Sequence, residues 1–189
     1  MDSPNKIVVY TCIINNYDEL QNYSNYCDGI DYICYTDSQF TPCGRWQLRN
    51  IDEIKSQDLE GLDPIRKARF IKMSPDLLFP DYEYSLYIDA KFIVKSDDLP
   101  RRIKAQIEKG SIYAGVLHPK RDCLYDESVV CIKAKRGDPK DIIRQVIKIG
   151  SEGFPENYGL YDTAIIFRKH HDPQVIALMN DWWWWIKNY

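Results

Sequence analysis

Apolar segments typical of β-strands alternate with helical segments along this chain, and that order limits the fold more than any other feature. The first apolar segment, residues 6–14 (KIVVYTCII), is rich in β-branched residues and ends at two asparagines. This pattern predicts a buried central strand followed by a turn. Further strands are predicted at residues 31–35, 46–51, 83–88, 112–117 and 163–167.

Helices are predicted between and after these strands, at residues 18–26, 64–78, 99–109, 122–135, 139–149 and 173–189. The helix at 64–78 has the clearest start, because Asp63 can cap it and Pro64 suits its first position. Apolar strands that alternate with helices form a mainly parallel sheet with helices on both faces. We therefore expect an α/β fold in which residues 1–189 form a single domain. The alternative is that they are the N-terminal part of a longer protein.

The charge balance argues against a nucleic-acid partner. The 25 basic and 28 acidic side chains leave a net charge of −3, whereas nucleic-acid-binding domains present a strongly basic surface. The polar residues 1–6 lack the features of a signal peptide, and no apolar run is long enough to span a membrane. Six cysteines without a C-x-x-C pair indicate free thiols. We expect a cytoplasmic protein without a membrane span.

Polar side chains follow several of the predicted strands. In open α/β sheets, ligands bind beyond the carboxyl ends of the strands. The residues placed there are Thr11, Asn16, Tyr17 and Asp37 from the first two strands, Asp89 and Lys91 from the strand at 83–88, and His118 and Arg121 from the strand at 112–117. We expect these side chains to converge on one binding site.

Asp89 ends the strand-like sequence YSLYID at residues 84–89. An ionised carboxylate at the end of a buried strand is unfavourable without a partner. A divalent cation that also binds a diphosphate is one such partner, because carboxylate and phosphate oxygens both suit a hard metal. The alternative is that Asp89 caps the following turn, and this residue alone favours that alternative.

A set of short motifs in a fixed order gives the sequence a resemblance to known proteins. The motifs are VYTC at 9–12, NYD at 16–18, TD at 36–37, a basic segment at 66–72, LFP at 78–80, YSLYIDAK at 84–91, HPKR at 118–121, YDE at 125–127, and GLYDT at 159–163 with Arg168 after it. The set resembles the glycosyltransferase-like family that includes the plant turgor-defect and mucilage-related proteins. The segment around Asp89 also resembles the metal-binding Asp-x-Asp region of GT-A-fold nucleotide-sugar glycosyltransferases and, more distantly, of glycosyltransferase family 8.

The resemblance implies a GT-A-type domain that transfers a sugar from a UDP-sugar donor to a glycan hydroxyl, with retention at the anomeric carbon. It places Mn²⁺ or Mg²⁺ on Asp89. It assigns Asp162 and Glu127 to catalysis, since a carboxylate beside the reacting carbon can stabilise an oxocarbenium-like state. The donor-binding residues are then Thr11, Asn16, Tyr17, Asp37, Arg66, Arg69, Lys72, Lys91, His118 and Arg121.

Most of these roles have an alternative in the residues themselves. Asp37 would accept the ring N–H of uracil, or it forms an Asx turn at a strand end. The cations at 66, 69 and 72 would flank a diphosphate from one side of a helix, or they form a solvated helix face. Asp162 would lie beside the reacting sugar, or it bonds local backbone N–H groups. His118 is favoured for the sugar end of the site over the rival pair at 170–171.

Two features depart from the family pattern. Lys91 stands where an Asp-x-Asp motif has its second carboxylate, and an ammonium group cannot ligate a metal. Either Asp89, the diphosphate and water hold the metal, or Lys91 neutralises phosphate itself, or Lys91 points away from the site. The other feature is four tryptophans at 182–185, whose side chains point in every direction around a helix. We expect a further domain or a second subunit to cover them, with a few exposed tryptophans as the alternative.

Two other functions stay open at this point. A module that binds a nucleotide-sugar or a glycan without turnover is favoured by Lys91 in place of a second carboxylate. A lipid-amide hydrolase is less expected, because the sequence has neither an H-E-x-x-H nor a G-x-S-x-G motif for that chemistry.

Overall fold

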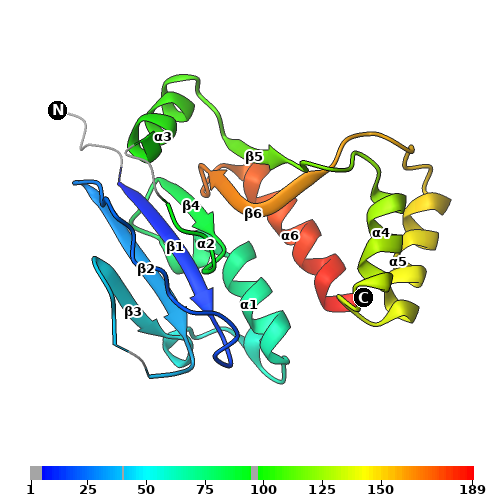
Figure 1. Cartoon of the computed structure of the whole chain (residues 1–189), viewed down its shortest axis with the longest axis horizontal. Helices are drawn as coiled ribbons and strands as arrows, with labels where there is room; N and C mark the ends of the chain where they lie inside the picture. Colours follow the sequence, from blue (N-terminus) through cyan, green and yellow to red (C-terminus); the bar gives the residue numbers. More distant parts are fainter. Residues whose placement is uncertain (1–5, 40, 95–97) are drawn as a thin grey trace.

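One six-stranded sheet carries the fold (Figure 1). The computed structural model describes residues 6–39, 41–94 and 98–189. The strands are β1 (Ile7–Ile13), β2 (Ile30–Thr36), β3 (Trp46–Asn50), β4 (Tyr84–Ile88), β5 (Tyr113–Leu117) and β6 (Tyr161–Arg168), and their order across the sheet is β3-β2-β1-β4-β6-β5. Strands β3, β2, β1 and β4 run parallel, whereas β6 is antiparallel to both of its neighbours. The expected α/β fold with a mainly parallel sheet is confirmed.

Some helices pack on the two faces of the sheet and others stand beside it. They are α1 (Pro64–Met73), α2 (Pro75–Leu78), α3 (Asp98–Glu108), α4 (Leu124–Lys133), α5 (Pro139–Ser151) and α6 (Pro173–Asn188), with the 3₁₀ turns η1 (Ile51–Glu53) and η2 (Gln57–Leu59) before α1. Neighbouring residues of β1 belong to opposite core layers, because side chains alternate along a strand. Tyr10 shares its layer with Ile71 of α1 and Trp182 of α6, and Val9 shares the other layer with Ile103 of α3. Helices α4 and α5 stand together beside the sheet (Figure 1).

Residues 18–26 are not helical, so the prediction of a helix there is wrong. The segment contains aspartate, serine and asparagine, whose side chains compete for backbone hydrogen bonds and disfavour helix interiors. Its aromatic rings pack on the sheet instead. Between ring centroids, Tyr23 lies 5.4 Å from Trp46 and Tyr26 lies 4.8 Å from Tyr32. Tertiary packing therefore decides the conformation of this segment over local propensity.

The predicted helix at 64–78 is correct at its start and wrong in its continuity. Asp63 accepts a hydrogen bond from the Arg66 N–H at 2.9 Å, which is the expected N-cap. The chain leaves the helical conformation at Ser74 (φ −115°, ψ 45°), and the short helix α2 follows. Pro75 is the cause, because proline has no N–H to donate and disfavours helical backbone at the residue before it. Helix α1 therefore ends with Lys72 in its last turn.

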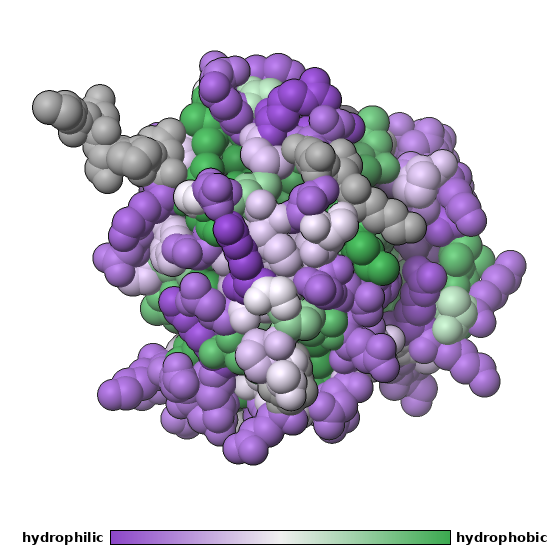
Figure 2. Space-filling model, turned by 60° about the vertical axis from the view of Figure 1, so that its left-hand side comes forward, coloured by the Kyte–Doolittle hydropathy of each residue, from purple (hydrophilic) through white to green (hydrophobic). Residues whose placement is uncertain are grey.

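The surface on the side of β2 and β3 is mainly hydrophilic, with smaller apolar areas between the polar side chains (Figure 2). In the part of the chain that the structure describes, no helix is both long enough and apolar enough to cross a membrane. All six cysteines are free thiols, as predicted.

Candidate functional site

The carboxyl ends of β1, β2, β4 and β5 lie at one edge of the sheet together with the amino end of β6, because β6 runs in the opposite direction (Figure 1). Open α/β sheets bind their ligands at this edge. Two groups of polar side chains gather there. We call them the lysine cluster (Lys72, Asp89 and Thr163) and the histidine cluster (His118, Arg121 and Glu127).

Lys72 is the centre of the lysine cluster. Its Nζ atom lies 3.5 Å from Asp89 Oδ1 and 3.3 Å from Thr163 Oγ1. The same atom lies 4.6 Å from the centre of the Tyr87 ring. The Lys72 side chain is 1% exposed, whereas the Asp89 side chain is 26% exposed. The cluster is therefore closed on the side of the lysine and open to a ligand at the aspartate.

Two buried side chains fix the backbone of Lys72. Its carbonyl oxygen accepts a hydrogen bond from the Tyr10 hydroxyl at 2.9 Å and from Arg168 Nη1 at 2.7 Å. Arg168 also donates to the Tyr10 hydroxyl. Because Lys72 lies in the last turn of α1, these bonds satisfy a carbonyl group that the helix itself leaves without a partner. The lysine is thus held firmly at the sheet edge.

Burial lowers the pKa of the Lys72 ammonium group to about 8. The negative charge of Asp89 opposes this shift, and the positive charge of Arg69 adds to it. At neutral pH most molecules therefore keep the charge on Lys72. Arg69 itself is exposed on α1, so a second cation acts on the lysine cluster from the surface.

The histidine cluster joins residues predicted for donor binding with one predicted for catalysis. Arg121 Nε donates to Glu127 Oε2, and His118 Nε2 lies 3.8 Å from the same oxygen. His118 Nδ1 accepts the backbone N–H groups of Lys120 at 3.3 Å and of Arg121 at 3.0 Å. Nδ1 is therefore the acceptor nitrogen of the ring, and Nε2 faces the Glu127 carboxylate and lies 3.4 Å from Arg121 Nη2.

Glu127 is held in its ionised form by its neighbours. Burial raises the pKa of its carboxyl group, but hydrogen bonds from Arg121 and Cys131 and the charges of Arg121 and His118 outweigh burial. The pKa of Glu127 therefore lies below its ordinary value. These contacts suit a carboxylate that orients Arg121 and His118, and the catalytic role of Glu127 stays a prediction.

The pairing of β5 with β6 is irregular near the start of β6. Gly115 pairs with Ile166 and Val116 pairs with Asp162, so β6 advances by four residues (166 − 162) where β5 advances by one (116 − 115). The extra residues of β6 include Thr163, a member of the lysine cluster. Bulges of this kind occur next to active sites, where they redirect a side chain.

Asp37 lies at this edge as predicted, but its carboxylate already takes part in a turn. Its two oxygens accept the Asn15 N–H, at 2.8 and 3.1 Å. Asn15 and Asn16 adopt left-handed φ angles of 57° and 52°, and Tyr17 beside them is 88% exposed. Asp37 therefore shapes the loop after β1, and its contact with uracil stays a prediction.

Thr11 and Arg66 lie outside the two clusters. The Thr11 side chain is buried within β1, and its hydroxyl group has no hydrogen-bond partner among the residues described. Arg66 donates to Asp63 Oδ2 at 2.8 Å and to the carbonyl oxygen of Ile186 at 3.2 Å. This residue therefore ties α1 to the end of α6. Of the three cations predicted on α1, Lys72 is the one in contact with the sheet edge.

Lys91 follows Asp89 in a turn and not in a continued strand. Strand β4 ends at Ile88, and the Phe92 N–H donates to the Asp89 carbonyl oxygen at 3.0 Å. The alternation of an unbroken strand therefore does not relate Asp89 to Lys91. Lys91 is exposed, with Nζ 5.6 Å from the centre of the Phe92 ring. Its part in phosphate binding stays a prediction.

Asp162 and His170 make local contacts. Asp162 Oδ1 accepts a hydrogen bond from the Ala164 N–H at 2.9 Å. This local backbone contact is the alternative to a catalytic role that the sequence suggested for Asp162. His170 is buried in the core with Nε2 at 3.1 Å from the Phe79 carbonyl oxygen, and burial lowers its pKa to about 4. The histidine at the sheet edge is His118. The catalytic role of Asp162 stays a prediction.

Comparison with known proteins gives the family. The sequence matches the family model described as TOD1/MUCI70, glycosyltransferase-like domain, over residues 1–176. The chain belongs to this family. The match confirms the resemblance that the ordered motifs indicate, and the six-stranded sheet is consistent with a GT-A-like domain. No curated protein and no solved structure matches the chain significantly.

The sequence did not predict a binding role for two residues of the site in this TOD1/MUCI70 domain. Thr163 and Tyr87 both contact Lys72. A signal for Thr163 was its place at the start of a strand that reaches the binding edge. Tyr87 gave no signal, because it lies within an apolar strand and reads as a core residue.

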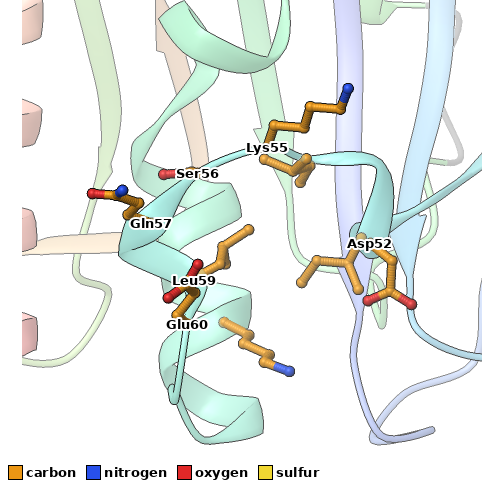
Figure 3. A pocket seen from close by; sticks show the side chains of 9 residues that line it. Asp52, Lys55, Ser56, Gln57, Leu59 and Glu60 are labelled. Carbon is orange, nitrogen blue, oxygen red and sulfur yellow. The ribbon is translucent and has the colours of Figure 1, made fainter.

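One cavity of the TOD1/MUCI70 domain, of about 480 Å³, lies between the connection after β3 and α1, where Lys67 lines it. Figure 3 shows that its labelled side chains, among them Asp52, Lys55 and Gln57, point in different directions and not toward a common centre. Neither cluster contributes to its wall. The lining of this cavity therefore presents no converging polar groups for a charged ligand, in contrast to the two clusters at the sheet edge.

A second cavity, of about 730 Å³, lies between α5, the loop after it and α6. We call it the aromatic cavity. Its wall includes Phe154, Tyr158, Trp182 and Trp185 together with Gln145 and Glu152. The Tyr125 hydroxyl of α4 donates to the Phe154 carbonyl oxygen at 2.6 Å and so fixes the loop.

The four tryptophans of α6 lie beyond residue 176, where the TOD1/MUCI70 match ends. Trp183 packs against Phe70 of α1, with ring centroids 5.4 Å apart, whereas Trp184 is 51% exposed. A helix cannot turn four consecutive side chains toward one core. The covering domain or second subunit stays a prediction.

Proposed function

We propose that this TOD1/MUCI70 domain transfers a sugar from a UDP-sugar donor to a hydroxyl group of a glycan. The observation that carries the proposal is the lysine cluster, in which a buried, charged lysine meets a partly exposed aspartate. The cluster lies at the edge where open α/β sheets bind ligands, and the family is glycosyltransferase-like. The diphosphate of a UDP-sugar is the group that such a cation would bind.

The proposed reaction needs a stabilised leaving group. The bond between the anomeric carbon and the β-phosphate oxygen breaks, and its electron pair leaves with UDP. The acceptor oxygen forms the new bond to the anomeric carbon, and the proton of the hydroxyl group passes to UDP or to water. Lys72 would stabilise the negative charge that develops on the leaving phosphate. Retention at the anomeric carbon is part of the proposal.

We propose the aromatic cavity as the binding site of the glycan acceptor. Cavities that bind small organic ligands combine aromatic walls with a few polar groups that orient the ligand, and sugar rings have both apolar C–H faces and hydroxyl groups. Tyr158 is 74% exposed and Phe154 is 39% exposed, so both rings are available. Their loop leads into β6, whose first residue, Tyr161, precedes Thr163 by two positions.

Release of UDP from UDP-sugars in the presence of glycan acceptors tests the proposal. We expect release from at least one common UDP-sugar. Lys72→Met should slow it by about 100-fold, which is the scale of losing one group that stabilises developing charge. Lys169→Met is the matched control and should leave the rate unchanged. The Lys169 ammonium pairs with Glu83 at 3.5 Å, at the other end of β6.

Two results would count against transfer at this site. The first is UDP binding without UDP release from any common UDP-sugar, which would favour a non-catalytic nucleotide-sugar-binding module. The second is an equal rate of release for the wild type and Lys72→Met, with both proteins folded by circular dichroism. That result would separate the lysine cluster from the chemistry.

A further inference from the structure

Asp89 pairs with an ammonium group in the lysine cluster and not with further carboxylates. Mg²⁺ and Mn²⁺ take about six ligands, mostly oxygens. Asp89 is the acidic side chain of the cluster, and its Oδ1 atom faces Lys72 Nζ at 3.5 Å. Over residues 6–39, 41–94 and 98–189, no group of three or more His, Cys, Asp and Glu side chains could hold a metal ion. The residues present therefore do not fit a metal held by three or more protein ligands.

Lys72 is also poorly placed to give way to a metal ion. Its side chain is 1% exposed, and its Nζ atom lies against the Tyr87 ring. Its carbonyl group is held by Tyr10 and Arg168. A divalent cation on Asp89 would stand beside this fixed ammonium group, and like charges at short range repel strongly where the site is partly buried.

The surroundings of the cluster favour an anion. Arg69 is exposed, and its charge acts on Lys72. Lys91 is exposed two residues after Asp89. Two exposed cations, one on α1 and one in the turn after β4, therefore accompany Lys72 near Asp89. A nucleoside diphosphate has several negative charges and would balance this excess.

We propose that the site binds the nucleoside diphosphate directly through Lys72, without a divalent metal ion. The inference rests on the proposed function, because it states how the same site holds its donor. Because the Lys72 side chain is 1% exposed, its ammonium group donates to a phosphate oxygen only when the Asp89 carboxylate, the more exposed member of the pair, moves aside. Before the diphosphate binds, Asp89 is a positioning residue that keeps the ammonium group directed toward the open edge of the cluster.

Calorimetric titration of the full chain with UDP tests the inference. We compare the Kd for UDP in Mn²⁺, in Mg²⁺ and after treatment with EDTA, and expect the three values to agree within about twofold. Lys72→Met should weaken UDP binding by about tenfold or more, which is the scale of a hydrogen bond to a charged group. Lys72→Arg should keep part of the affinity, and the control Lys169→Met should keep all of it.

Uridine separates a positioning role of Asp89 from a general structural role. Asp89→Asn should weaken UDP binding less than Lys72→Met does, and by the same factor in all three metal conditions. Uridine lacks the diphosphate, so its affinity should be the same in the wild type, Asp89→Asn and Lys72→Met. A loss of uridine affinity in Asp89→Asn would show damage to the whole site and would contradict the positioning role.

Each remaining outcome decides between the two proposals. UDP binding that requires Mn²⁺ or Mg²⁺ and is lost in Asp89→Asn would overturn the metal-free site and leave the transfer reaction standing. Metal-independent binding that is unchanged in Lys72→Met would also overturn it. If the wild type binds UDP under none of these conditions, both proposals are wrong. The metal comparison uses the wild-type chain alone, so it decides even if Lys72→Met does not fold.

Discussion

Arg168 is fully buried, yet its hydrogen-bond partners are neutral. They are the carbonyl group of Lys72, the hydroxyl group of Tyr10 and the sulfur of Met179. A buried cation without a carboxylate partner is unfavourable in most settings. Its place at the last turn of α1 offsets this, because the free carbonyl groups at a helix C-terminus carry partial negative charge. Arg168 thus caps the helix whose last turn presents Lys72 to the sheet edge.

Tyr10→Phe should therefore destabilise the protein by about 1–3 kcal/mol, the scale of leaving a buried polar group unsatisfied. The substitution keeps the ring but removes the oxygen to which Arg168 donates. Arg168 Nε already lacks a partner within the described part of the chain. Urea unfolding measured by tryptophan fluorescence gives the free energy. Tyr158→Phe is the control, because Tyr158 is 74% exposed, and equal stability of the two variants would contradict the capping role.

Individual residues also show how far a sequence can predict a site. Asp89 and His118 lie at the predicted edge because the ends of apolar strands can be read from the sequence. The spacing of Arg66 and Lys72 places both on one side of α1, but Arg66 binds the end of α6. Spacing along a helix does not predict which partner each side chain contacts. The place of Thr163 at the start of a strand could be predicted, but its contact with Lys72 could not, because the direction of its side chain depends on the irregular register between β5 and β6.

Among the elements, the positions of the strands could be predicted from the sequence more directly than the conformation of the segments between them. Apart from Ser85, β1 and β4 consist of β-branched, apolar and aromatic residues, which suit strands covered on both faces. The break between α1 and α2 follows from Pro75, although the apolar residues after it suggested one longer helix. The conformation of residues 18–26 depends on the sheet surface that they cover, and no local sequence pattern describes that surface.

Helix α6 presents two neighbouring tryptophans to different surroundings. Trp185 lines the aromatic cavity, whereas Trp184 is 51% exposed and is not part of its wall. If the cavity holds the glycan acceptor, Trp185→Ala should weaken acceptor binding by about tenfold, the scale of losing one well-packed aromatic contact. Trp184→Ala should leave that binding unchanged.

Calorimetry with a panel of neutral and uronic-acid tetrasaccharides measures this difference. UDP affinity serves as the internal control in both variants, because the lysine cluster is not part of the cavity wall. Equal losses in Trp184→Ala and Trp185→Ala would contradict an acceptor site in the aromatic cavity. So would the failure of every tetrasaccharide to bind the wild-type chain.

Burial is unevenly distributed over the whole molecule. β1 and β4 lie between two core layers, and nearly all of their residues are buried. Helices α4 and α5 have no fully buried residue along their described lengths and stand together beside the sheet (Figure 1). Parts of a protein with few buried apolar contacts open locally at a lower free energy than its core. The helical pair beside the sheet is therefore expected to open before the sheet itself.

Native-state hydrogen exchange should show this division. Amides of α4 and α5 should exchange about 100-fold faster than those of β1 and β4, because an opening free energy lower by about 3 kcal/mol gives that ratio. The aromatic cavity is lined by α5 and α6, so an acceptor bound there should slow exchange in α5 far more than in β1. Uniform exchange over the described chain would contradict the division. An acceptor that protects β1 as strongly as α5 would place the acceptor site outside the aromatic cavity.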